Sequence, residues 1–136
     1  MATDMISHWP VRVSLPLEDG DTDAGGFLTV EAIARLFGLL RVEYLRGCAT
    51  LVDLTVVVGD VAVERGSVPA AGRTVSGSVA VVEVFPDRVT MSARIRPGEG
   101  PGIAATASCR LTPEGGVSHE VQAELIARAQ GARHLH

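Results

Sequence analysis

The sequence predicts an α+β fold in which one long central helix is wrapped by a curved antiparallel sheet of about five strands. Three observations lead to this prediction. Residues 29–46 carry apolar side chains at helical spacing on most sides of the expected helix. After residue 51 the apolar period changes from 3.6 to 2, and three consecutive segments each have one clean apolar face. A buried helix and a one-sided sheet combine most simply when the sheet wraps around the helix.

Composition bounds the class of protein. The chain has 136 residues, of which 46% are hydrophobic and 21% charged, so we expect one globular domain covering residues 1–136. The formal net charge of −4 disfavours a nucleic-acid binder, because sequence-independent binding needs a basic surface. All 12 basic residues are arginine, which excludes a Schiff-base lysine mechanism. No stretch approaches the roughly 18 apolar residues of a membrane span.

Three further features bear on location and metal binding. Cys48 and Cys109 share no Cys-x-x-Cys motif, so we expect two small buried thiols in a reducing cytoplasm rather than a disulfide framework. Residues 1–10 include an acidic residue and no apolar core, so they do not resemble a secretory signal. His8 and His119 have no partners at metal-ligand spacing, so no metal site is predicted.

The first predicted elements are a strand at residues 11–15 and the long helix, separated by an acidic, glycine-rich loop at residues 18–26. The helix begins after Thr29, a suitable N-cap, and ends at Arg46, with Gly47 placed to terminate it. Its main apolar stripe is formed by Ile33, Leu36, Phe37, Leu40 and Tyr44. Its other sides carry Ala32, Leu39, Val42 and Leu45. A helix that is apolar on most sides is usually surrounded by protein.

Four strands and a short helix are predicted after the long helix. The first strand spans residues 51–63, with Gly59-Asp60 as a break. The next three strands, at residues 73–85, 89–96 and 103–111, alternate apolar and polar residues and form an antiparallel meander packed on one side. The short helix, at residues 118–129, has Val121, Leu125 and Ala129 on one face.

The loop before the long helix permits three interpretations. It imitates a calcium-binding loop, with Asp21 and Asp23 at the first and third ligand positions. However, Gly25 stands at the fifth position and Ala32 stands where a bidentate Glu is required, and a strand rather than a helix precedes the loop. The second interpretation is a plain strand-to-helix connection, because Asp and Gly are common turn residues.

The third interpretation is a catalytic loop. Asp23 lies just before a helix N-terminus, with Gly25 and Gly26 between them. Backbone N–H groups at such a terminus can hold a developing oxyanion, and glycines let a ligand approach the backbone. A carboxylate there can attack an acyl carbon or take a proton from water. This arrangement suits thioesters, whose thiolate leaves readily. Glu31 is a possible second carboxylate, and Asp21 is a possible accessory residue that orients the loop.

The same loop carries a family resemblance, together with the segments on either side of it. The matching stretches are Trp9-Pro10-Val11-Arg12-Val13, Asp21-Thr22-Asp23-Ala24-Gly25-Gly26 and Arg41-Val42-Glu43-Tyr44-Leu45-Arg46. They resemble the 4-hydroxybenzoyl-CoA thioesterase-like hotdog family, and most closely its branch of acyl-CoA thioesterases from the Tol–Pal gene cluster. The resemblance implies the hotdog fold, a long helix wrapped by a curved antiparallel sheet.

The resemblance also implies a function and its residues. It implies hydrolysis of an acyl-CoA or acyl-carrier-protein thioester, with Asp23 as nucleophile or general base and no cofactor apart from the CoA thioester as substrate. Backbone N–H groups near Val30 and Glu31 would form the oxyanion hole, beside Gly25 and Gly26. A homodimer or tetramer with active sites at the subunit interface is implied as well. The chain departs from the branch at Val30, where a His is usual.

Other functions stay open at the level of sequence. The substitution at Val30 is compatible with a non-catalytic hotdog protein that binds acyl groups or serves assembly. A hydratase or dehydratase normally needs a His with a carboxylate, and no His lies between Trp9 and Val117. Four arginines of the polar strand faces, Arg88, Arg94, Arg96 and Arg110, either face solvent or recognise the phosphates of CoA or of a carrier-protein pantetheine arm.

Overall fold

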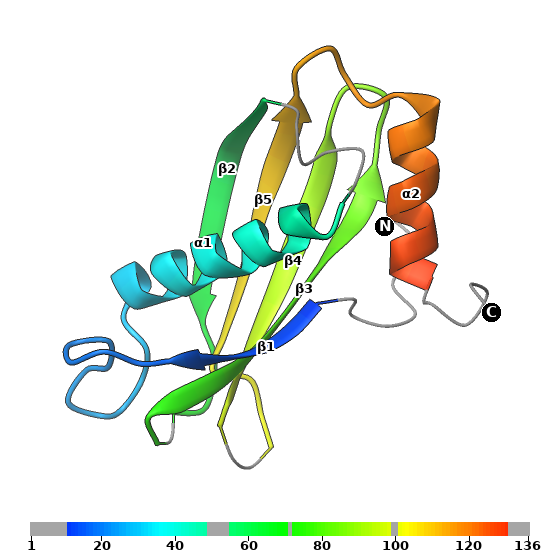
Figure 1. The fold of residues 1–136 in the computed structure, drawn as a ribbon. Coiled ribbons are helices and arrows are strands. Elements are labelled where there is room, and N and C mark those ends of the chain that lie inside the picture. Colours follow the sequence, from blue (N-terminus) through cyan, green and yellow to red (C-terminus); the bar gives the residue numbers. More distant parts are fainter. Residues whose placement is uncertain (1–10, 49–54, 71, 99–100, 131–136) are drawn as a thin grey trace.

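The computed structural model describes residues 11–48, 55–70, 72–98 and 101–130. It confirms the predicted α+β fold, with a five-stranded sheet and two helices in the described residues (Figure 1). In chain order the elements are β1 (Val11–Pro16), α1 (Val30–Arg46), β2 (Val56–Arg65), β3 (Thr74–Val84), β4 (Val89–Pro97), β5 (Ala105–Pro113) and α2 (His119–Gln130). Helix α1 lies across one face of the sheet, which we call the inner face (Figure 1).

The sheet is antiparallel throughout, with the strand order β1-β3-β4-β5-β2. Strands β3, β4 and β5 form the predicted meander, and β1 and β2 form the two edges. The predicted break in β2 is confirmed, because the register against β5 shifts between Gly59 and Ala62 and Asp60 adopts a φ of 51°. Residues 51–54 of the strand predicted there lie outside the described residues.

Helix α1 begins and ends close to the predicted residues. The Thr29 hydroxyl accepts a hydrogen bond from the Ala32 N–H at 3.1 Å, as expected of an N-cap. Gly47 terminates the helix, but its φ of −86° is not the left-handed conformation for which glycine is usually chosen. Instead, Nη1 of Arg128, on α2, donates a hydrogen bond to the Gly47 carbonyl at 2.9 Å, which satisfies a carbonyl at the end of the helix.

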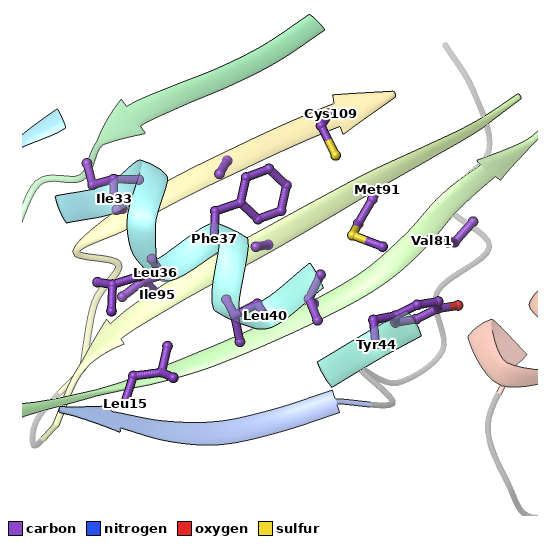
Figure 2. Close-up of a cluster of buried hydrophobic side chains, with 14 of the residues drawn as sticks. Leu15, Ile33, Leu36, Phe37, Leu40, Tyr44, Val81, Met91, Ile95 and Cys109 are labelled. Carbon is purple, nitrogen blue, oxygen red and sulfur yellow. The ribbon is translucent and has the colours of Figure 1, made fainter. Parts of the chain in front are cut away.

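The core lies between α1 and the inner face of the sheet. The alternation predicted for β4 is confirmed, because Val89, Met91, Ala93 and Ile95 are all buried. Figure 2 shows the helix side chains Ile33, Leu36, Phe37 and Leu40 pointing toward strand residues that include Leu15, Met91 and Ile95. Both cysteines are buried and free, as expected of small apolar residues.

Gly77, at the centre of β3, lets the helix approach the sheet. A Cβ atom at this position would lie 2.9 Å from Cδ2 of Leu40 and 3.2 Å from Cδ1 of Leu15. At these distances the side chains of Leu40 and Leu15 would have to shift to admit a larger residue, so Gly77 allows α1 to pack closely on β3.

The expectation that protein surrounds α1 on most sides is wrong for the single chain. Leu39 and Val42 lie three residues apart on the helix surface turned away from the sheet, and they are 42% and 54% exposed. The sheet covers only the stripe centred on Leu36 and Leu40, which are fully buried. Helix α2 instead packs against β3 through a face that includes the buried Val121 and Leu125. Neither helix has the length and apolar composition needed to cross a bilayer.

Candidate active site

The loop between β1 and α1 is an ordered hairpin. Thr22 bridges to Leu28, and the Asp23 N–H donates to the Phe27 carbonyl at 2.9 Å. The Gly26 N–H donates to the Asp23 carbonyl at 2.9 Å, and Gly26 has a φ of +85°, which a residue with a side chain adopts rarely. This turn brings Asp23 back beside the residues that lead directly into α1.

Asp21 anchors the hairpin to the helix. Asp21 is only 8% exposed, and its Oδ2 accepts a hydrogen bond from the Glu18 N–H at 2.7 Å. The same oxygen forms an ion pair with Nη2 of Arg35, on the second turn of α1. The Asp21 carbonyl also accepts from the Thr29 N–H at 2.9 Å. The geometry therefore places Asp21 where it orients the loop, and its carboxylate is directed at Arg35.

Asp23 has a different environment, although it lies only two residues away. Its side chain is 38% exposed, and its Oδ1 accepts hydrogen bonds from the N–H groups of Gly25 at 2.9 Å and Phe27 at 3.0 Å. Its Oδ2 forms an ion pair with Nη2 of Arg65, the last residue of β2. The hydrogen bond from Phe27, followed by those from Arg65 and Gly25, lowers the pKa of Asp23 below its usual value. Asp23 is therefore an ionised, solvent-accessible carboxylate at neutral pH.

Arg65 and Phe27 are members of this site that the sequence analysis did not identify. The Arg65 guanidinium carbon lies 5.5 Å from the centroid of the Phe27 ring, so the arginine is held by a cation–π contact as well as by Asp23. Arg65 is 42 residues from Asp23 along the chain. No sequence motif links the two, because only the pairing of β2 with β5 brings the end of β2 to the start of α1.

The other predicted site residues lie in the same hairpin or at the start of α1, and they differ in whether their backbone N–H groups already donate within the protein. The N–H groups of Gly25 and Gly26 both donate within the hairpin, so these glycines shape the loop. The Ala32 and Ile33 N–H groups both donate to Thr29. Val30 and Glu31 come before them, in the first turn of α1, where no intrahelical acceptor exists. Their N–H groups can therefore bind an external anion or carbonyl oxygen.

The side chains of Val30 and Glu31 are both exposed. Val30 is 55% exposed, in the first turn of the helix that follows the Asp23 hairpin.

The arginine partners also bear on the calcium-loop interpretation. In that interpretation Asp21 and Asp23 would share one ion, yet each forms an ion pair with a different arginine, Arg35 or Arg65. Among the described residues, no group of three or more His, Cys, Asp or Glu side chains is arranged to hold a metal ion.

Comparisons with known proteins identify the fold. No protein-family model and no curated protein matches the chain. Among solved structures, a Thermus thermophilus thioesterase complexed with coenzyme A and Zn has a TM-score of 0.72 and 20% identity, over 91% of this chain and 98% of that one. A thioesterase-superfamily protein from Jannaschia has a TM-score of 0.76 and 14% identity, over 92% and 86%. A DHNA-CoA thioesterase from Staphylococcus aureus has a TM-score of 0.61 and 18% identity, over 75% and 72%.

These similarities establish the hotdog fold, in agreement with the sequence-based prediction. At 14–20% identity they extend to the fold alone. The site described above depends on this chain's own residues, above all on Asp23 and its partners.

Proposed function

We propose that this protein is a thioesterase that hydrolyses acyl-CoA or acyl-carrier-protein thioesters, with Asp23 as its catalytic carboxylate. One observation carries the proposal. An accessible carboxylate, held ionised by two backbone N–H groups and an arginine, shortly precedes a helix N-terminus whose first N–H groups have no intrahelical acceptor. Solved thioesterases with the same fold support it. The motif at residues 21–26 supports assignment to the Tol–Pal-cluster branch, and the proposed location is the cytoplasm.

The proposed mechanism divides the work between the carboxylate and the helix. The N–H groups of Val30 and Glu31 would bind the thioester oxygen and stabilise the negative charge that develops there. On the nucleophilic route, the Asp23 carboxylate attacks the acyl carbon, the carbon–sulfur bond breaks and the thiol leaves. Water then hydrolyses the acyl-aspartyl anhydride to the free acid. On the general-base route, Asp23 takes a proton from the water that attacks the acyl carbon.

The lowered pKa of Asp23 keeps its carboxylate ionised, which both routes require. No imidazole stands at Val30 to take a proton in its place. A single turnover in ¹⁸O-labelled water tests this choice. The nucleophilic route places ¹⁸O in the Asp23 carboxylate when water attacks the aspartyl carbonyl of the anhydride, whereas the general-base route places it only in the released acid.

We also propose a homodimer or tetramer. Strand β2 is an edge strand, and Val57 and Val61 on it are 64% and 48% exposed. Leu39 and Val42 are exposed on α1. An edge strand and an apolar helix surface of this kind are usually covered in the assembled protein. Sedimentation of the full chain tests this part of the proposal, and a monomer at all concentrations would contradict it.

The first experiment compares wild type and Asp23→Asn for thiol release from short, medium and long acyl-CoAs, aryl-CoAs and an acyl-carrier protein. Asn retains the side-chain oxygen that accepts from Gly25 and Phe27, so the loop should keep its shape. We expect turnover by wild type and a loss of about 10²–10⁴-fold in the variant. Asp87→Asn, in the exposed turn between β3 and β4, is the matched control and should retain full activity.

A second candidate function follows from the exposed Val30. A hotdog protein that binds acyl groups or serves assembly without turnover would need no proton-transferring residue at this position. It predicts that acyl-CoA binds to wild type and to Asp23→Asn with similar affinity, while no substrate of the panel releases thiol. Restoring the residue usual in the branch, by Val30→His, would then be expected to create measurable turnover.

A further inference from the structure

The outer face of the sheet is the face turned away from α1 (Figure 1). Its outward residues are mostly serines, threonines and arginines, as the alternation of β3, β4 and β5 requires. One cross-strand row joins Arg12 on β1, Ser78 on β3 and Arg94 on β4. In the neighbouring row, Ser76 on β3 pairs with Arg96 on β4.

These five residues line one hollow of about 290 Å³. Arg12 and Arg94 flank Ser78, so their Cα atoms are two strand spacings apart, about 10 Å. Arg94 and Arg96 are two residues apart on one strand, about 7 Å. Arginine side chains are long enough to converge from these positions on a single group above the two serines.

The charge of the hollow is not a consequence of the overall composition, because the chain carries a net charge of −4. Five other arginines form ion pairs with carboxylates: Arg35, Arg46, Arg65, Arg88 and Arg110. Within the described residues, neither Arg12 nor Arg96 has an ion pair. Glu64 is an acidic residue in the same cross-strand row as Arg94, but it lies two strands away from Arg94, on the edge strand β2. Clustered guanidinium groups repel one another, and a bound anion removes this cost.

We propose that this hollow is a binding site for the phosphate or diphosphate group of a phosphorylated ligand. Guanidinium groups donate paired hydrogen bonds that match phosphate oxygens, and serine hydroxyls add further donors. The volume lies at the lower end of the range for small-molecule sites, so it holds a phosphate or diphosphate group while the rest of the ligand extends outside. The site does not depend on the proposed hydrolysis, because Asp23 pairs with Arg65, whose strand partner is Ala105, a buried residue of the inner face.

The test is calorimetric titration of the full chain with inorganic diphosphate at low ionic strength, where screening is weak. We expect wild type to bind, and the double variant Arg12→Gln/Arg96→Gln to bind at least about tenfold more weakly. Arg110→Gln is the matched control, because Arg110 lies on the same face, outside the hollow, and pairs with Asp60. Arg110→Gln should change the affinity for diphosphate by less than about twofold. Asp23→Asn should bind diphosphate like wild type, so a failure of the proposed catalysis would leave this result unaffected.

Two sources of the phosphate group are distinguished by competition. If CoA displaces diphosphate and pantetheine does not, the ligand is the nucleotide end of CoA. If CoA does not displace it, the ligand is another phosphate ester. Both outcomes support the site. Absence of diphosphate binding to wild type at millimolar concentration would overturn it, as would unchanged binding by the double variant. The proposed phosphate site would also be overturned if ligand-free wild type formed a dimer while the double variant stayed monomeric. The outer face of the sheet would then be a subunit contact.

Discussion

The two ends of helix α1 have opposite properties. At the N-terminal end, Asp23 is ionised and Val30 is exposed, and the first N–H groups of the helix have no intrahelical acceptor. At the C-terminal end, Tyr44 and Cys48 are fully buried, and Arg128 donates a hydrogen bond to the Gly47 carbonyl. The Arg128 guanidinium also lies 4.7 Å from the centre of the Tyr44 ring. One end is open to a ligand, whereas side chains of the protein close the other.

The difference concerns which backbone groups of the helix are left for a ligand. Both ends carry unsatisfied backbone groups, as every helix does. At the C-terminal end the Gly47 carbonyl is satisfied within the protein, because Arg128 of α2 places its positive charge at the negative end of the helix dipole. The N-terminal groups are left for an external oxygen, and the adjacent carboxylate is kept charged. Substitutions at the two ends should therefore affect different measurements.

The largest expected effect is on stability, at the closed end. Tyr44→Ala removes a fully buried ring from between α1 and α2, and should lower the free energy of unfolding by about 3–5 kcal/mol in urea denaturation. Tyr44→Phe keeps the ring and should retain most of the stability. Thiol release by the folded fraction should be unchanged in both variants. A loss of activity in stable Tyr44→Phe would break the separation between the two ends.

The next effect concerns the reactivity of the buried thiol. Burial raises the pKa of Cys48 to about 11. At pH 8 its thiolate fraction should be more than about a hundredfold below that of an exposed cysteine with a pKa near 8.5. A Cys109→Ser variant isolates Cys48, and a thiol-specific disulfide reagent should label it slowly in the native state but rapidly in denaturant. Fast labelling of native protein would show that the closed end opens.

The same pKa shift fixes the sign of a pH effect on stability. The folded state holds the Cys48 proton more tightly than the unfolded state, so the contribution is complete below about pH 8.5. It is lost as the pH rises toward 11. Cys109 acts in the same direction, since burial raises its pKa as well. The midpoint of thermal unfolding should therefore fall over this range, and should fall less when both cysteines are replaced by alanine.

The smallest expected effect is at the open end. Arg65→Ala removes the ion pair with Asp23 but leaves the Gly25 and Phe27 hydrogen bonds, so the pKa of Asp23 should rise toward its usual value. The acid limb of kcat/KM should then move to higher pH. The rate at neutral pH should change by no more than about fivefold, because exposed ion pairs are weak. Arg65→Lys should restore part of the shift. An unmoved acid limb would show that Arg65 does not act on Asp23.

Several features of the molecule were determined by the sequence alone. The helix from Val30 to Arg46, its Thr29 cap and the buried face of β4 follow from periodicity and local hydrogen bonding, which act over a few residues. The loop with Asp23 before the helix was also readable, because its Asp and Gly residues are local signals. The α+β arrangement of a helix wrapped by a sheet followed from the same patterns, because it is the simplest arrangement of these elements. The hotdog fold followed from the family resemblance of the loop and the segments on either side of it.

Only the tertiary structure decided which side chains meet. Pairing of β2 with β5 brings Arg65 to Asp23, and α2 brings Arg128 to the end of α1. The outer-face hollow needs the registers of β1, β3 and β4, because a shift of one residue would turn its arginines to the inner face. The exposure of Val42 likewise depends on which side of α1 the sheet covers, not on the apolar character of the helix. These features join residues far apart in sequence, so no local pattern carries them.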